Sequence, residues 1–150
     1  MLNKTIRSLI LGVLIIGILQ IYNSVSAESN PPNINSETQV IKDITPDEAF
    51  LLIEKNKDNS NLVILDVRTS KEFEDGHIKN AINLDFYSET FKDDLDKLDK
   101  NKIYVTHCQL GGRSAKTVVM MKDLGFVEVY NITGGIAEWK SKGLPTIKSP

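Results

Sequence analysis

The sequence predicts an α/β protein with a central, mostly parallel sheet and helices on both faces. From residue 40 onward, short apolar runs of strand length alternate with segments of helical periodicity, and the connections between them are short. The run over residues 62–65 is continuously apolar, which is typical of a strand covered on both faces. In folds of this class, functional groups gather at the carboxyl ends of the strands, in the loops that lead into helices.

Each expected element has a local reason in the sequence. Residues 45–48 supply an N-cap, a proline at the first helical position and an acid at the third, and residues 69–72 have the capping-box pattern. The segment 114–124 is expected to be helical, with Ala115, Val118 and Val119 on one side. The other expected elements are strands at 40–41, 62–65, 81–84, 103–105 and 127–132, and helices carrying Phe91, Leu95 and Leu98, and Ile136 and Trp139.

Length and composition fit one globular domain, which we place at residues 40–147. The chain has 150 residues, of which 41% are hydrophobic and 25% are charged. Its 18 basic and 20 acidic side chains give a formal net charge of −2. Such a balance supplies no broad electrostatic attraction, so we expect no nucleic-acid partner.

The first 27 residues have the order of a secretory signal peptide. A basic start is followed by an apolar run over 9–19 and by small residues at 25–27. We therefore predict a signal peptide over residues 1–27, a polar linker over 28–39, and export to the periplasm or the extracellular space, with no membrane span after cleavage. The apolar run is short for a span, which needs about 20 residues. An uncleaved membrane anchor formed by residues 9–21 is the alternative.

The lone cysteine, Cys108, lies between an expected strand and the helix expected to begin near Ser114. It cannot form an internal disulfide, and a free thiol in an oxidising compartment is a liability unless it is buried or used. Two adjacent glycines, Gly111 and Gly112, allow backbone conformations barred to other residues, so the loop can turn its N–H groups inward around an anion. The helix start and Arg113 add positive charge, so we expect a lowered pKa for Cys108.

This combination predicts a nucleophilic sulfur in an anion-binding loop. Attack on sulfur and attack on phosphorus both fit, and a tight turn with an incidental cysteine is the non-catalytic alternative. Asp66 and Arg68 follow another expected strand and are interpreted as a structural polar pair near the loop. His77 is expected to cap a turn and His107 to pack, and with no second histidine expected close by we expect no metal site.

Four segments, in order and spacing, resemble motifs of the rhodanese family. They are Leu65-Asp66-Val67-Arg68, the stretch from Glu72-Phe73 to Asn83, the loop from Cys108 to Ser114, and the stretch from Gly134-Gly135 to Pro145. The rhodanese loop reads Cys, two residues, Gly, one residue, Arg. Here Gln109, Leu110, Gly111 and Gly112 separate Cys108 from Arg113. Phosphatases that share this fold have one residue more, so the count favours sulfur.

The resemblance implies a sulfurtransferase without a cofactor. Cys108 would take the outer sulfur of a small donor anion such as thiosulfate and pass it, from a persulfide, to a thiol acceptor or to cyanide. The loop N–H groups would stabilise the persulfide, and Arg113 would hold the donor. Gln109 and Leu110 depart from the charged residues that many rhodaneses carry there, so they are candidates for acceptor selection. A non-catalytic persulfide carrier, serving a sulfur-relay partner protein, is the alternative.

Overall fold

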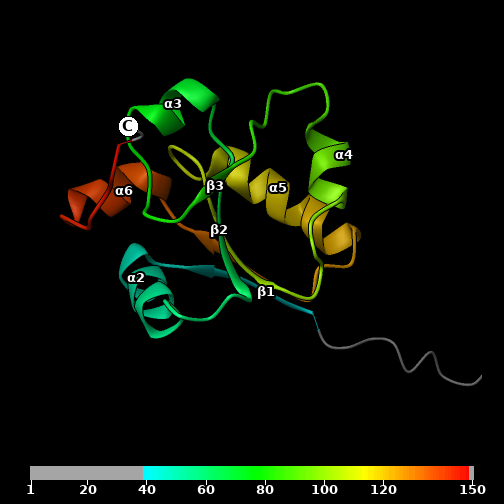
Figure 1. Ribbon diagram of the computed structural model, residues 1–150, viewed down its shortest axis with the longest axis horizontal. Helices are drawn as coiled ribbons and strands as arrows, with labels where there is room; N and C mark the ends of the chain where they lie inside the picture. Colours follow the sequence, from blue (N-terminus) through cyan, green and yellow to red (C-terminus); the bar gives the residue numbers. More distant parts are fainter. Residues whose placement is uncertain (1–38, 149–150) are drawn as a thin grey trace, which may run out of the picture. The chain divides into compact units, whose positions relative to one another are not determined.

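The sheet at the centre of the molecule has five strands, all parallel (Figure 1). The computed structural model describes residues 39–148. The strands follow the order β1-β5-β4-β2-β3 across the sheet, and each neighbouring pair is parallel, so the predicted α/β class is confirmed. Their bounds are Val40–Ile44 for β1, Leu62–Asp66 for β2, Ile82–Asn83 for β3, Ile103–His107 for β4 and Glu128–Ile132 for β5.

The helices begin where the sequence supplies caps. Thr45 and Thr69 each accept a hydrogen bond from the N–H three residues on, and the carboxylates of Glu48 and Glu72 accept from the N–H of their capping threonine. Both predicted capping boxes are therefore formed. The described helices are α2 Pro46–Lys55, α3 Ser70–Glu74, α4 Phe91–Asp96, α5 Gly112–Asp123 and α6 Gly135–Ser141.

The two faces of the sheet carry separate hydrophobic clusters. Leu65 and Tyr104 pack with buried residues of α4 and α5, whereas their neighbours Ile64 and Val105 pack with buried residues of α2 and α6. Side chains alternate between the faces of a strand, so a strand that serves both clusters must be apolar throughout. This requirement explains the continuous apolar run of β2. Figure 1 shows the two helix pairs on opposite sides of the sheet.

The buried side of α5 differs from the prediction. Ala115 is exposed and Val119 is 59% exposed, whereas Ser114 and Thr117 are fully buried beside Val118. The buried hydroxyls donate to backbone oxygens of the preceding turn, Ser114 to Gly111 and Thr117 to Arg113. Because these polar groups are satisfied locally, hydrophobic periodicity alone did not identify the inward side.

The parallel arrangement brings three chain segments to one edge of the sheet. β4 ends immediately before Cys108, its neighbour β2 ends at Asp66, and β5 on the other side leads into α6. The candidate loop therefore lies between the segments that follow β2 and β5.

The predicted signal peptide and all but the last residue of the predicted linker lie outside the described residues. Within residues 39–148, no helix has the length and apolar content needed to cross a membrane.

Candidate active site

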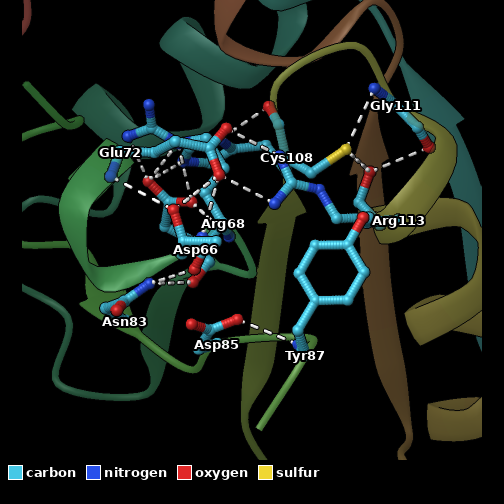
Figure 2. A network of polar contacts seen from close by, with 12 residues as sticks. Asp66, Arg68, Glu72, Asn83, Asp85, Tyr87, Cys108, Gly111 and Arg113 are labelled. Atoms are coloured by element: carbon cyan, nitrogen blue, oxygen red, sulfur yellow. Dashed lines mark hydrogen bonds and ion pairs between the residues drawn. The ribbon is translucent and has the colours of Figure 1, made fainter.

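Cys108 lies at the base of a loop that hydrogen-bonds to its sulfur (Figure 2). The residue is 2% exposed and directly follows β4. The N–H of Gly111 donates to Sγ over 3.1 Å. The hydroxyl of Ser114 lies 3.6 Å from Sγ and 3.1 Å from the Gly111 carbonyl oxygen, so these two acceptors share its one proton. Gly111 has a φ of +95° and is the N-cap of α5, so this glycine needs the left-handed region that favours its residue type.

The surroundings of Cys108 favour the thiolate. Burial raises the pKa of the Cys108 thiol, but hydrogen bonds from the N–H and hydroxyl of Ser114, and from the N–H groups of Leu110 and Gly111, outweigh it. The pKa of Cys108 therefore lies below its ordinary value. The sulfur also lies beside the first turn of α5, whose aligned N–H groups favour negative charge.

The loop is held from outside by α6. The N–H of Ile136 donates to the carbonyl of Cys108 over 2.9 Å, and the N–H of Ala137 donates to the carbonyl of Gln109 over 3.1 Å. In a trans peptide the C=O and the following N–H point in opposite directions, and the described chain has no cis peptide. With its carbonyls directed at α6, the loop must direct the N–H of Leu110 toward the sulfur side.

Two glycines permit this contact between α6 and the loop. Gly134 and Gly135 have φ values of +68° and +60°, and a Cβ on Gly135 would overlap the carbonyl oxygen of Cys108. The backbone of α6 can therefore approach the loop closely only if this position is glycine.

Arg113 is engaged by an acid from a different helix. Its Nη1 and Nη2 donate to the two carboxylate oxygens of Glu72 over 2.8 and 2.7 Å, which is a bidentate pair. The guanidinium also lies 5.5 Å from the ring centre of Tyr87 (Figure 2). Hydrogen bonds from Arg113, helped by those from Thr69 and opposed by partial burial, lower the pKa of Glu72 to about 2.

Asp66 and Arg68 form the buried polar pair that was expected. Nε and Nη2 of Arg68 donate to the Asp66 carboxylate over distances of 3.0 and 2.6 Å, and Nη2 also donates to the carbonyl of Gly76. The two residues are 0% and 2% exposed. Asn83 donates to the carbonyl oxygens of both. The pair thus ties the end of β2 to the neighbouring segments.

His107 was expected to pack, and His77 to cap a strand or a turn. His107 is fully buried, with Nε2 3.6 Å from the Asp66 carboxylate. Burial lowers the pKa of His107, although Asp66 opposes this, so the imidazole is neutral. His77 hydrogen-bonds the carbonyl of Phe73 and stacks on its ring. Within residues 39–148, no group of three or more His, Cys, Asp or Glu side chains is placed to hold a metal ion.

Comparison with known proteins decides the family. The model of the rhodanese-like domain matches residues 45–142, which is more than half of the chain. The chain belongs to the rhodanese-like domain family.

Two curated relatives differ in how much of their length this rhodanese-like chain spans. It is 33% identical over 100 residues to the thiosulfate sulfurtransferase GlpE of Coxiella burnetii, covering 67% of this chain and 88% of the relative. It is 32% identical over 133 residues to the tRNA uridine(34) hydroxylase of Aster yellows witches'-broom phytoplasma, covering 80% of this chain but 42% of the relative. The second likeness thus involves less than half of the hydroxylase.

Solved rhodanese-like structures share the architecture. A rhodanese-like domain protein from Staphylococcus aureus is 38% identical with a TM-score of 0.57, and the match covers 72% of this chain and 99% of that one. A rhodanese-related protein from Thermoplasma volcanium is 27% identical with a TM-score of 0.61, with the same coverage of both chains.

The sequence alone missed three contributions that the structure shows around Cys108. Glu72 was interpreted as a helix-capping residue and Ser114 as a helix start, both within motif-like segments, but neither was given a contact in the site. In the structure Glu72 pairs with Arg113, and Ser114 hydrogen-bonds Sγ. The contact of α6 with the loop was not anticipated. Gly111 and Gly112 were both expected to allow backbone conformations barred to other residues, but Gly112 is the first residue of α5 and its φ is not positive.

The outer side of the loop is open to solvent. Gln109 is exposed, Leu110 is 74% exposed, and Tyr87, beside Arg113, is 70% exposed. Their position beside the loop is compatible with the acceptor-selecting role predicted for Gln109 and Leu110.

Replacing Gly135 tests the contact between α6 and the loop. Gly135→Ala should destabilise the fold and raise the pKa of Cys108, because the new Cβ displaces the Cys108 carbonyl. Gly143→Ala is the control, since Gly143 has a φ of +73° but open space around it. In the control, the free energy of unfolding should fall only by the cost of placing alanine in the left-handed backbone conformation, about 1–2 kcal/mol. Urea unfolding and the pH dependence of iodoacetamide alkylation measure both effects, and equal behaviour of the two variants would contradict the interpretation.

Removing one hydroxyl tests the sulfur environment. Ser114→Ala deletes a donor to Sγ, so the alkylation midpoint of Cys108 should move to higher pH. Thr117→Ala is the matched control, because its hydroxyl is equally buried on α5 but donates to the Arg113 carbonyl. A midpoint that moves equally in both variants would show that the effect comes from α5 packing and not from the hydrogen bond to sulfur.

Proposed function

We propose that this protein is a sulfurtransferase that carries sulfane sulfur as a persulfide on Cys108. The observation that carries the proposal is the convergence of backbone N–H groups and the Ser114 hydroxyl on a single sulfur atom, which lowers the pKa of Cys108. A stabilised thiolate is the form of cysteine that attacks sulfur. The 33% identity to a thiosulfate sulfurtransferase over 88% of that relative supports the same chemistry.

The proposed reaction is a pair of displacements at sulfur. The Cys108 thiolate attacks the outer sulfur of a donor such as thiosulfate, a bond forms between Sγ and that sulfur, and the bonding electrons of the donor's S–S bond leave with sulfite. The resulting persulfide anion extends the sulfur by one atom into the loop, where the N–H groups and α5 stabilise its charge. An acceptor thiolate, or cyanide, then attacks the outer sulfur and regenerates the Cys108 thiolate.

The position of the hydrogen-bond donors around Sγ favours sulfur over phosphorus as the atom that Cys108 attacks. The Gly111 N–H lies 3.1 Å from Sγ itself, so the loop closes on the cysteine sulfur. Bringing a phosphoryl group to Sγ would require a wider loop, and only four residues separate Cys108 from Arg113. A phosphatase is therefore less well supported than a sulfurtransferase.

The acceptor is proposed to be a thiol that approaches over Gln109 and Leu110. These side chains lie on the loop and are exposed, and Leu110 presents an apolar surface next to the reacting sulfur. A partner protein whose thiol is surrounded by apolar side chains would match the apolar surface that Leu110 presents here. The same surface would serve a persulfide carrier in a sulfur relay, which is the alternative to an enzyme with its own turnover.

Export is proposed from the order of residues 1–27, which is that of a signal peptide. The mature protein is expected to begin near Glu28 and to be found in the periplasm or outside the cell. N-terminal sequencing of the protein from that fraction tests the proposal. A membrane-bound product that still starts at Met1 would instead indicate an anchor formed by residues 9–21.

Intact-mass measurement tests the persulfide directly. Incubation with thiosulfate should add one sulfur atom to the wild-type chain, and cyanide should remove it. Cys108→Ser should gain no sulfur and transfer none, because a hydroxyl cannot hold a transferable sulfur, while the similar size of serine preserves the fold. Multiple turnovers with thiosulfate and cyanide distinguish an enzyme from a carrier. Sulfur transfer by the serine variant at the wild-type rate would disprove the proposal.

A further inference from the structure

Glu72 occupies the part of Arg113 that is best shaped to bind an anion. Both terminal nitrogens of the guanidinium donate to its carboxylate, and the paired side chains are 16% and 31% exposed. The guanidinium lies over the ring of Tyr87, 5.5 Å from the ring centre, and the charge of the Cys108 thiolate helps to raise the pKa of Arg113. The arginine therefore lies next to the reacting sulfur, but its charge is already balanced.

The position of Glu72 is fixed by more than this pair. Its carboxylate also accepts hydrogen bonds from the N–H and the hydroxyl of Thr69 over 3.0 and 2.8 Å, which closes the capping box of α3. A side chain held by both a helix cap and a bidentate arginine does not leave easily when a donor arrives. A donor anion thus meets a neutral ion pair beside the thiolate and not an open cation.

We propose that Glu72 is a specificity-determining residue, and that by neutralising Arg113 it makes the site favour persulfide donors over dianions such as thiosulfate. The inference rests on the sulfur transfer proposed above. In the favoured reaction the Cys108 thiolate attacks the outer sulfur of R–S–S–H. The new S–S bond forms at Sγ, the original S–S bond breaks, and its electron pair leaves with the thiolate R–S⁻. The proton stays on the transferred sulfur, so atoms and charge balance.

The selectivity follows from Coulomb's law. The energy of a donor in the field of the site is proportional to the donor's charge. Removing the positive potential of Arg113 therefore weakens the binding of a dianion twice as much as that of a monoanion, and leaves a neutral donor unaffected. A persulfide carries at most one negative charge on the sulfur that moves, whereas thiosulfate carries two charges.

The chain offers a matched control for the test. Glu48 forms the same capping box at the start of α2, with Thr45 in the place of Thr69, but its carboxylate makes no ion pair with an arginine among residues 39–148. Glu72→Gln and Glu48→Gln each replace a capping carboxylate by an amide whose oxygen can still accept both hydrogen bonds from the capping threonine. Only Glu72→Gln leaves the charge of Arg113 unbalanced.

The experiment compares two donors on the full chain. Rate constants for loading Cys108 are measured by intact mass with thiosulfate and with 2-hydroxyethyl persulfide, a donor whose organic part is uncharged. Glu72→Gln should raise the ratio of the thiosulfate to the persulfide rate constant by about tenfold, the factor that corresponds to about 1.4 kcal/mol. Glu48→Gln should leave the ratio at the wild-type value. Because both donors react with the same thiolate, any change in the pKa of Cys108 affects both and cancels in the ratio.

A second variant tests the opposite sign. Arg113→Gln leaves Glu72 as an unbalanced anion, so the same ratio should fall below that of the wild type. An unchanged or reduced ratio in Glu72→Gln, or a ratio that rises in Arg113→Gln, would overturn the role given to Glu72. Failure of the wild-type chain to gain sulfur from either donor would instead overturn the proposed sulfurtransferase function.

Discussion

The site depends on the hydrogen bonds that α6 donates to the carbonyl oxygens of Cys108 and Gln109. These bonds occupy N–H groups of the first turn of α6, which would otherwise need solvent or a cap. They also fix the orientation of these two peptide groups, so that the N–H of Leu110 is directed toward the sulfur. One set of contacts therefore completes a helix end and creates the environment that lowers the pKa of Cys108. Gly135 is required because no side chain fits between the two backbones at this position.

The fold could be predicted from the sequence because each element has a local cause. The capping boxes that begin at Thr45 and Thr69, and the doubly buried β2, depend on neighbours in the chain or on a simple periodicity, and the structure has them where they were expected. The prediction of which side of α5 faces inward was wrong, because Ser114 and Thr117 are buried and their hydroxyls donate to backbone oxygens. Local hydrogen bonding of that kind leaves no trace in hydrophobic periodicity.

The candidate site could be predicted only as far as its own loop. Cys108, Gly111 and Arg113 are close in sequence, so the sequence alone indicates that they belong to one anion-binding loop. The sequence does not indicate the partners that other segments supply. Glu72 and Gly135 are brought to the loop only by the strand order, in which β4 lies between β2 and β5. Parallel sheets with many different strand orders give the same alternation of strands and helices. The sequence therefore predicted that Arg113 binds a donor anion, but it did not predict that Glu72 already pairs with the guanidinium.

Charge is distributed around this cysteine in a consistent way. Arg68 is neutralised by Asp66 and Arg113 by Glu72, so neither guanidinium is an open cation beside the thiolate. The hydrogen bonds that lower the pKa of Cys108 come from backbone N–H groups and one hydroxyl, beside the first turn of α5. Dipoles at hydrogen-bond distance act strongly on the atom they contact and weakly on a charge a few ångströms farther out. Such an arrangement holds a sulfur anion at one point without attracting every small anion in solution, which is what the proposed selection between sulfur donors requires.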